Sequence, residues 1–161
     1  MRWVTKVFIS LLVCMTIQSS TLHAQSGMGV APASDAKGER AALNSRWTGR
    51  WLGGGFVFDA ELFLKVSKNN RASGHIAWTA VSAPPERRDY QNKIGLKGNE
   101  YVSGHYDPAT RLVSLEGIRK DDPNNVIGLD KYRMVLTRNN KGLAGVSWSR
   151  GKWNSSIALQ R

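Results

Sequence analysis

The sequence predicts an all-β protein: an antiparallel meander of about eight strands closed into a small barrel and preceded by a signal peptide. Apolar and polar side chains alternate in successive short segments, which is the period of half-buried strands. Asn, Asp, Pro and Gly separate these segments at hairpin spacing. A closed barrel is favoured over an open sheet because closure removes the exposed edges.

Residues 1–24 have the features of a secretory signal peptide. A basic start with Arg2 and Lys6 precedes the apolar run VFISLLVCMTI, and Ala24 offers a small residue at the cut. The apolar run is shorter than the roughly 20 residues of a bilayer-spanning helix. We therefore expect a periplasmic or secreted protein with no transmembrane span after cleavage, and an uncleaved anchor is the alternative.

Charge and cysteine content limit the partners and the redox chemistry. The 161 residues carry a net charge of +11, and cleavage leaves 21 basic against 12 acidic residues, or about +9. Cleavage also removes Cys14, so the mature chain can form no disulfide. Positive charge favours anionic lipid or polysaccharide. The basic residues are scattered, however, as on any solvated surface, and no aromatic and basic platform for nucleic acid is evident.

Residues 25–45 are predicted to be a flexible leader, with at most one helical turn near GERAAL, because they are small, polar and without strand periodicity. The barrel domain is predicted to span residues 46–161.

The first clear strand is FDAELFLKV, in which Phe63 breaks an otherwise regular alternation; the residues on its apolar face are Phe58, Ala60, Leu62, Leu64 and Val66. The later strand segments are ASGHIAWTAV, EYVSGHY, RLVSLEGI, DKYRMVLT, LAGVSW and KWNSSIALQR. GGGF, residues 53–56, is expected to form a turn or a bulge. Residues 82–99 contain two prolines and mixed charges, so we expect a long loop with a possible edge strand over residues 90–96.

The tripeptide Ser-Gly-His occurs twice, and a third copy keeps only the glycine. The shared glycines are Gly74, Gly104 and Gly145. A glycine inside a strand permits a bend or a close backbone approach, so the repeat is expected to be architectural. The alternation directs His75 and His105 outward, and no spacing typical of a zinc site is present. No metal or other cofactor is predicted.

No catalytic motif stands out. The mature chain lacks cysteine and a G-x-S-x-G elbow, and Asp59 and Glu61 share one exposed strand face. The sequence therefore predicts that the protein is not an enzyme. A hydrolase is the alternative if a histidine or two carboxylates converge in a concave site.

WTGRWLGG near the start and ALQR at the end resemble the calycin pattern of lipocalins and avidins. The resemblance implies a barrel in which Trp51, after Gly49 and Arg50, packs against Arg161 at the closed end. The opening strands look most like those of an avidin. The biotin-binding residues do not carry over, since Gly53 stands where an Asn is expected and Ile76 or Trp78 where a Tyr is expected.

The aromatic residues carry the functional prediction. Five tryptophans remain after cleavage, enough to fill the core and also to line an open barrel mouth. We expect a binding module for a small molecule or glycan, whose candidate ligand-binding residues are Trp78, Tyr101, Ser103, Tyr106 and Trp148. The alternative is an envelope interaction protein that uses its basic surface on anionic lipid, polysaccharide or a protein partner.

Overall fold

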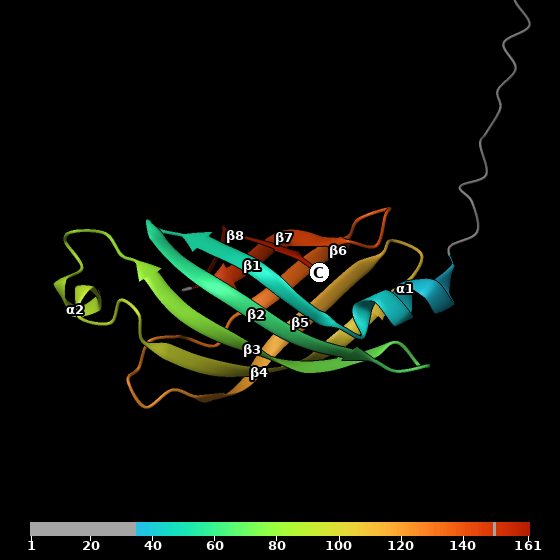
Figure 1. Cartoon of the computed structure of the whole chain (residues 1–161), viewed down its shortest axis with the longest axis horizontal. Coiled ribbons are helices and arrows are strands. Elements are labelled where there is room, and N and C mark those ends of the chain that lie inside the picture. Colours follow the sequence, from blue (N-terminus) through green and yellow to red (C-terminus); the bar gives the residue numbers. More distant parts are fainter. Residues whose placement is uncertain (1–34, 150) are drawn as a thin grey trace, which may run out of the picture. The chain divides into compact units, whose positions relative to one another are not determined.

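The computed structural model describes residues 35–149 and 151–161, so the predicted signal peptide and residues 25–34 lie outside the described residues. Eight strands follow one another around a closed antiparallel barrel (Figure 1). The strands are β1 (Arg46–Gly53), β2 (Phe56–Val66), β3 (Arg71–Ser82), β4 (Lys97–Asp107), β5 (Leu112–Asp121), β6 (Lys131–Leu136), β7 (Gly142–Ser149) and β8 (Lys152–Gln160). Over the described residues, no helix has the length and apolar character to cross a membrane.

The barrel confirms the predicted fold class. Each strand pairs with its neighbour in the chain, and β1 also pairs with β8, with Trp51 opposite Ile157. This last pairing removes the two free edges of the sheet.

The strand alternation separates the core from the outer face. All five residues predicted to share the apolar face of β2 are buried. Phe63 lies on the outer face, is 37% exposed and stacks on His75 with 4.6 Å between the ring centres. His75 and His105 face outward as predicted, because Ile76 and Tyr106 beside them are buried.

The repeated glycines occupy inward positions where neighbouring strands come very close. A Cβ atom on Gly104 would lie 1.9 Å from the carbonyl oxygen of Ser114. The corresponding distance is 2.0 Å for Gly74, to Phe63, and 1.9 Å for Gly145, to Arg133. The Ser-Gly-His repeat is therefore a feature of the strongly coiled strands.

Two connections at one barrel end show how the chain turns there. GGGF forms the β1–β2 turn, where Gly54 and Gly55 have φ angles of 57° and 80°. A short helix, α2 (Arg88–Gln91), lies between β3 and β4. The prediction of an edge strand over residues 90–96 is therefore wrong. The backbone N–H groups of Tyr90 and Lys93 donate to carbonyls three residues earlier, which gives consecutive turns instead of a ladder.

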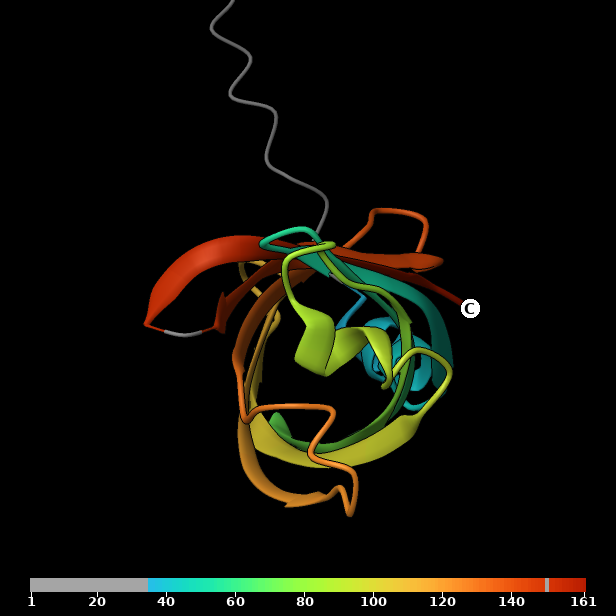
Figure 2. The ribbon, with the colours of Figure 1, turned by 90° about the vertical axis from the view of Figure 1, so that its left-hand side faces the viewer.

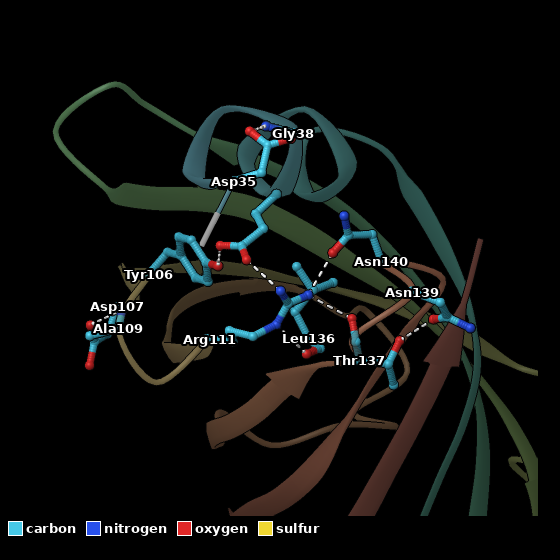
Figure 3. Close-up of polar contacts among 11 residues, drawn as sticks. Asp35, Gly38, Tyr106, Asp107, Ala109, Arg111, Leu136, Thr137, Asn139 and Asn140 are labelled. Atoms are coloured by element: carbon cyan, nitrogen blue, oxygen red, sulfur yellow. Dashed lines mark hydrogen bonds and ion pairs between the residues drawn. The ribbon is translucent and has the colours of Figure 1, made fainter. Parts of the chain in front are cut away.

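The predicted leader contains a helix that closes the other barrel end. Helix α1 (Ala36–Leu43) begins at Asp35, whose side chain accepts a hydrogen bond from the backbone of Gly38 (Figures 1 and 3). Leu43 is fully buried, and the indole of Trp47 donates to its carbonyl at 3.3 Å. The prediction of a flexible segment was wrong here, because α1 buries its inner side in the barrel.

A polar network fastens α1 to the turns at the closed end (Figure 3). Glu39 is 1% exposed and accepts hydrogen bonds from Tyr106 and Arg111. The Arg111 guanidinium also donates to the carbonyls of Leu136 at 3.0 Å and Thr137 at 2.6 Å. Burial, and then the bond to Glu39, raise the pKa of Tyr106. One carboxylate thus ties the helix to β4 and to the β4–β5 turn.

We expect Glu39→Ala to lower the free energy of unfolding by about 2–4 kcal/mol, because it leaves the Arg111 and Tyr106 donors without their buried acceptor. Alanine is the best helix former, so the loss cannot come from helix propensity. Urea unfolding measures the change. Lys37→Ala on the exposed side of α1 is the control, and equal effects of the two substitutions would contradict this role for Glu39.

Gly104→Ala is expected to destabilise the barrel by about 1–3 kcal/mol or more, because the added methyl meets a backbone carbonyl that cannot move freely. Thermal unfolding monitored by circular dichroism provides the measurement. Ser103→Ala, next in sequence but on the outer face, should change the melting temperature little.

Candidate ligand-binding site

A cavity of about 330 Å³ opens at the barrel end opposite α1. In the view along the barrel, α2 lies in front of this opening (Figure 2). The lining residues that come from the barrel wall include Trp51, Phe58, Trp78, Glu100, Tyr132 and Ser155. The connections between strands contribute Gly54, Tyr90, Val126, Ile127, Gly128, Leu129 and Asp130. The volume lies at the small end of the range for small-molecule sites.

Aromatic rings follow one another around the wall of the cavity. Trp51 and Phe58 meet edge to face at 5.6 Å between ring centres, and Phe58 meets Trp78 in the same way at 6.2 Å. Trp78 in turn stacks on Tyr132 at 6.4 Å. The indole N–H of Trp51 donates to the hydroxyl of Ser147 at 2.6 Å, which fixes its orientation. The cavity therefore presents a mainly apolar and preformed surface.

Glu100 places a carboxylate in this aromatic wall. Its Oε2 accepts from the Trp78 indole at 3.1 Å and from the Tyr132 hydroxyl at 2.6 Å. Its Oε1 accepts from the backbone N–H of Asp130 at 2.8 Å. Gly117 makes room for the carboxylate, because a Cβ there would lie 2.0 Å from Oε1. The side chain is thus held in one orientation by three donors.

The surroundings of Glu100 disfavour its negative charge. Burial raises the pKa of Glu100 to about 7, although the bonds from Tyr132, Asp130 and Trp78 act in the opposite direction. Burial and the neighbouring Glu100 charge raise the pKa of Tyr132. Among the described residues, no Lys, Arg or His forms an ion pair with Glu100. A buried carboxylate without a cationic partner, in a cavity, marks a candidate functional group.

The rim of the cavity is held by interactions between its connections. Phe56 and Tyr90 pack edge to face at 4.9 Å, and the Arg87 guanidinium lies 4.7 Å from the Tyr90 ring centre. Lys93 donates to the carbonyl of Asn125 at 2.7 Å, which links the α2 segment to the β5–β6 connection. These contacts favour a mouth whose shape exists before a ligand arrives.

The structure places one of the five predicted ligand-binding residues in this cavity. Trp78 lines it, whereas Tyr101 and Ser103 lie on the outer face of β4. Tyr106 is buried at the closed end, and Trp148 is 37% exposed on the outside of β7. The other four predicted residues do not line this cavity. These residues were selected by residue type. Only every second residue of a strand faces the interior, so residue type alone does not place a side chain in the cavity.

Trp51 and Arg161 do not form the predicted pair. Trp51 lines the open cavity, whereas the Arg161 guanidinium donates to the carbonyl of Asn140 at the α1 end. The register explains the separation, because Trp51 lies opposite Ile157, four residues before Arg161.

Glu100 and Tyr132 are functional candidates that the residue types alone did not indicate. The alternation of β4 could have indicated Glu100, because Glu100 stands two residues before the buried Val102 and therefore faces inward. A charged residue in the apolar phase of a strand is unusual and requires partners. Across the described residues, no three His, Cys, Asp or Glu side chains gather to hold a metal ion.

The chain matches no protein-family model, no curated protein and no solved structure. Its site is therefore defined by its own residues and their geometry.

Protonation of Glu100 should couple the stability of the protein to pH. A folded pKa of about 7, against an ordinary value of 4.5, means that the folded state holds more protons between these values. The free energy of unfolding therefore falls by about 3 kcal/mol as the pH rises from about 4.5 to about 7.5, and the cost stays constant above.

This decrease is expected in the difference between the wild type and Glu100→Gln, measured by urea unfolding across that pH range. Taking the difference cancels the opposing contributions of Asp89 and Asp107, whose pKa values hydrogen bonding lowers in both proteins. A difference that does not change with pH would show that Glu100 is ionised throughout.

Proposed function

We propose that the protein is an exported, non-enzymatic, calycin-like barrel that binds a small, largely apolar molecule carrying a positive charge at its open end. One observation carries the proposal: the acidic residues Glu100 and Asp130 line the cavity, and no described Lys, Arg or His does. The exported chain would carry a net charge of about +9, so the acidic cavity contrasts with the charge of the protein as a whole.

The aromatic wall supports the same class of ligand. The faces of Trp, Tyr and Phe rings attract cations, and the attraction grows when the cation is desolvated. The rings of Trp51, Phe58 and Trp78 also offer apolar surface to the rest of the molecule. An amine on a short hydrocarbon or aromatic frame satisfies both features.

Glu100 supplies the specific contact in this proposal. Three donors leave its carboxylate with remaining acceptor capacity. An ammonium group at this position would give the buried charge the counter-ion that the described residues lack. Charge-assisted hydrogen bonds of this kind contribute about 1.5–3 kcal/mol.

A hydrolase remains a second candidate, because Glu100 and Asp130 are two carboxyl groups in one concave site. Against it, the hydrogen bonds from Trp78, Asp130 and Tyr132 are all donated to Glu100, so its oxygens are oriented to accept hydrogen bonds. A general acid must instead present its proton to the substrate.

Calycin-like architecture is compatible with the closed eight-stranded meander. Biotin is not the proposed ligand. Gly53 lines the cavity where the avidin pattern has an Asn.

The proposal predicts binding of phenethylamine, with 2-phenylethanol and phenylacetate as neutral and anionic analogues of similar size. Calorimetric titration should show the amine bound most tightly. Glu100→Gln should weaken amine binding about tenfold or more and change alcohol binding little, because only the amine forms the charged contact. Amine affinity should also fall as the pH drops below about 7, when Glu100 becomes protonated.

Glu116→Gln provides the matched control, since Glu116 pairs with Lys131 on the outer face. Tighter binding of phenylacetate than of the amine, or equal loss in both variants, would refute the proposed ligand class. Mass spectrometry of the recovered probes separates the hydrolase alternative when ester or glycoside analogues are added, because a binding module returns them intact.

A further inference from the structure

The exposed apolar side chains are concentrated around the mouth of the cavity. Ten large apolar residues of the described chain are more than a third exposed. Six of them lie in a connection of the open end or within two residues of one: Leu52, Ile94, Leu96, Leu129, Trp148 and Trp153. We call these six residues the apolar rim. Each of the four connections contributes at least one of them.

The opposite end of the barrel differs. By the same measure, its three turns, over residues 67–70, 108–111 and 137–141, and helix α1 have one of the ten, Val135, in or within two residues of them. Both ends carry basic residues, so charge alone does not distinguish them. The apolar rim is therefore a feature of the end that holds the cavity, and not of barrel ends in general.

Two tryptophans form the most prominent part of the apolar rim. Trp148 and Trp153 flank the β7–β8 turn and pack edge to face at 5.6 Å, yet they remain 37% and 39% exposed. The Arg133 guanidinium lies 5.0 Å from the Trp153 ring centre. Tryptophan beside basic side chains is typical of surfaces that lie in the headgroup region of a bilayer.

The basic residues of this end are placed to meet anionic headgroups. Arg88, Lys97 and Lys152 lie in or beside the same connections as the apolar rim, and none forms an ion pair with a described acidic residue. A basic residue near an anionic membrane surface is attracted by it, and the attraction adds up over several residues. An apolar ring with such cations between its members complements a negatively charged lipid surface.

We propose that the open end of the barrel docks on an anionic lipid bilayer, with the apolar rim in the headgroup region and the cavity facing the membrane. The proposal rests on the apolar rim and its basic neighbours and does not require a particular cavity ligand. A second copy of the chain or a protein partner is the competing occupant, which the test below separates.

The test measures co-flotation of the protein, in its exported form, with lipid vesicles. The vesicles contain phosphatidylcholine and phosphatidylglycerol, and binding is compared at about 0.1 M and about 0.5 M salt. All variants share one N-terminal segment, so differences between them report the barrel. The wild type should bind, and more weakly at high salt. Trp148→Ser/Trp153→Ser and Lys97→Glu/Lys152→Glu should each bind about tenfold more weakly or worse.

Two controls match these variants. Val135→Ser/Val146→Ser removes exposed apolar residues from the barrel wall, and Lys68→Glu/Lys141→Glu reverses charges at the closed end. Both should bind within about twofold of the wild type. The proposal is overturned by equal binding to pure phosphatidylcholine, by a larger loss in the closed-end variant, or by absence of binding. Sedimentation velocity tests the competing occupant. If the wild type is a dimer that binds no vesicles, and Trp148→Ser/Trp153→Ser is a monomer, the occupant is a second copy of the chain.

Phenethylamine titration of Trp148→Ser/Trp153→Ser without vesicles keeps the two proposals separate. Both tryptophans lie outside the cavity lining, so amine affinity should equal that of the wild type. Loss of vesicle binding with retained amine binding supports docking by the apolar rim, whereas loss of both would overturn it by showing that the variant has damaged the barrel.

Discussion

The pairing of β1 with β8 is the contact on which the rest of the structure depends. It turns a meander of hairpins into a closed wall, so that every second side chain must face a narrow interior. An interior of eight strands is just wide enough for side chains to fill. Whether such a barrel is solid or hollow at a given level then depends on the residues that face inward there.

The two ends of the barrel use this constraint differently. At the α1 end, helix residues and the Glu39–Arg111 ion pair occupy the interior, so the barrel is closed by side chains of the chain itself. At the α2 end several wall residues are aromatic, and they line a cavity. Both ends contain a buried carboxylate. Glu39 has a cationic partner, whereas Glu100 is bound only by neutral donors, and this difference separates a structural role from a candidate binding role.

Much of the barrel could be predicted from sequence because alternation and turn residues are local signals. The inner face of β2, the turn at Gly54 and the close approach at Gly104 all follow from them. The site was harder to predict, because it depends on which strands meet at one level of the barrel. Glu100, Trp78 and Tyr132 lie on three strands and come together only through the register of the closed sheet. For helix α1, one turn near GERAAL was predicted but its full length and packing were not, since its burial comes from the barrel end that it covers.

The acidic lining of the cavity contrasts with the positive net charge of the protein, and this contrast has a consequence for any cationic ligand. An exported chain with a net charge of about +9 repels a free cation over roughly a Debye length, about 8–10 Å in physiological salt. The acidic lining attracts the same cation only at short range, inside the mouth. An anionic surface held against the rim would neutralise the basic side chains there and also concentrate apolar cations next to the opening. The two proposals are thus independent in their evidence but complementary in their physics: docking would remove the electrostatic barrier to the ligand that the cavity is best suited to hold.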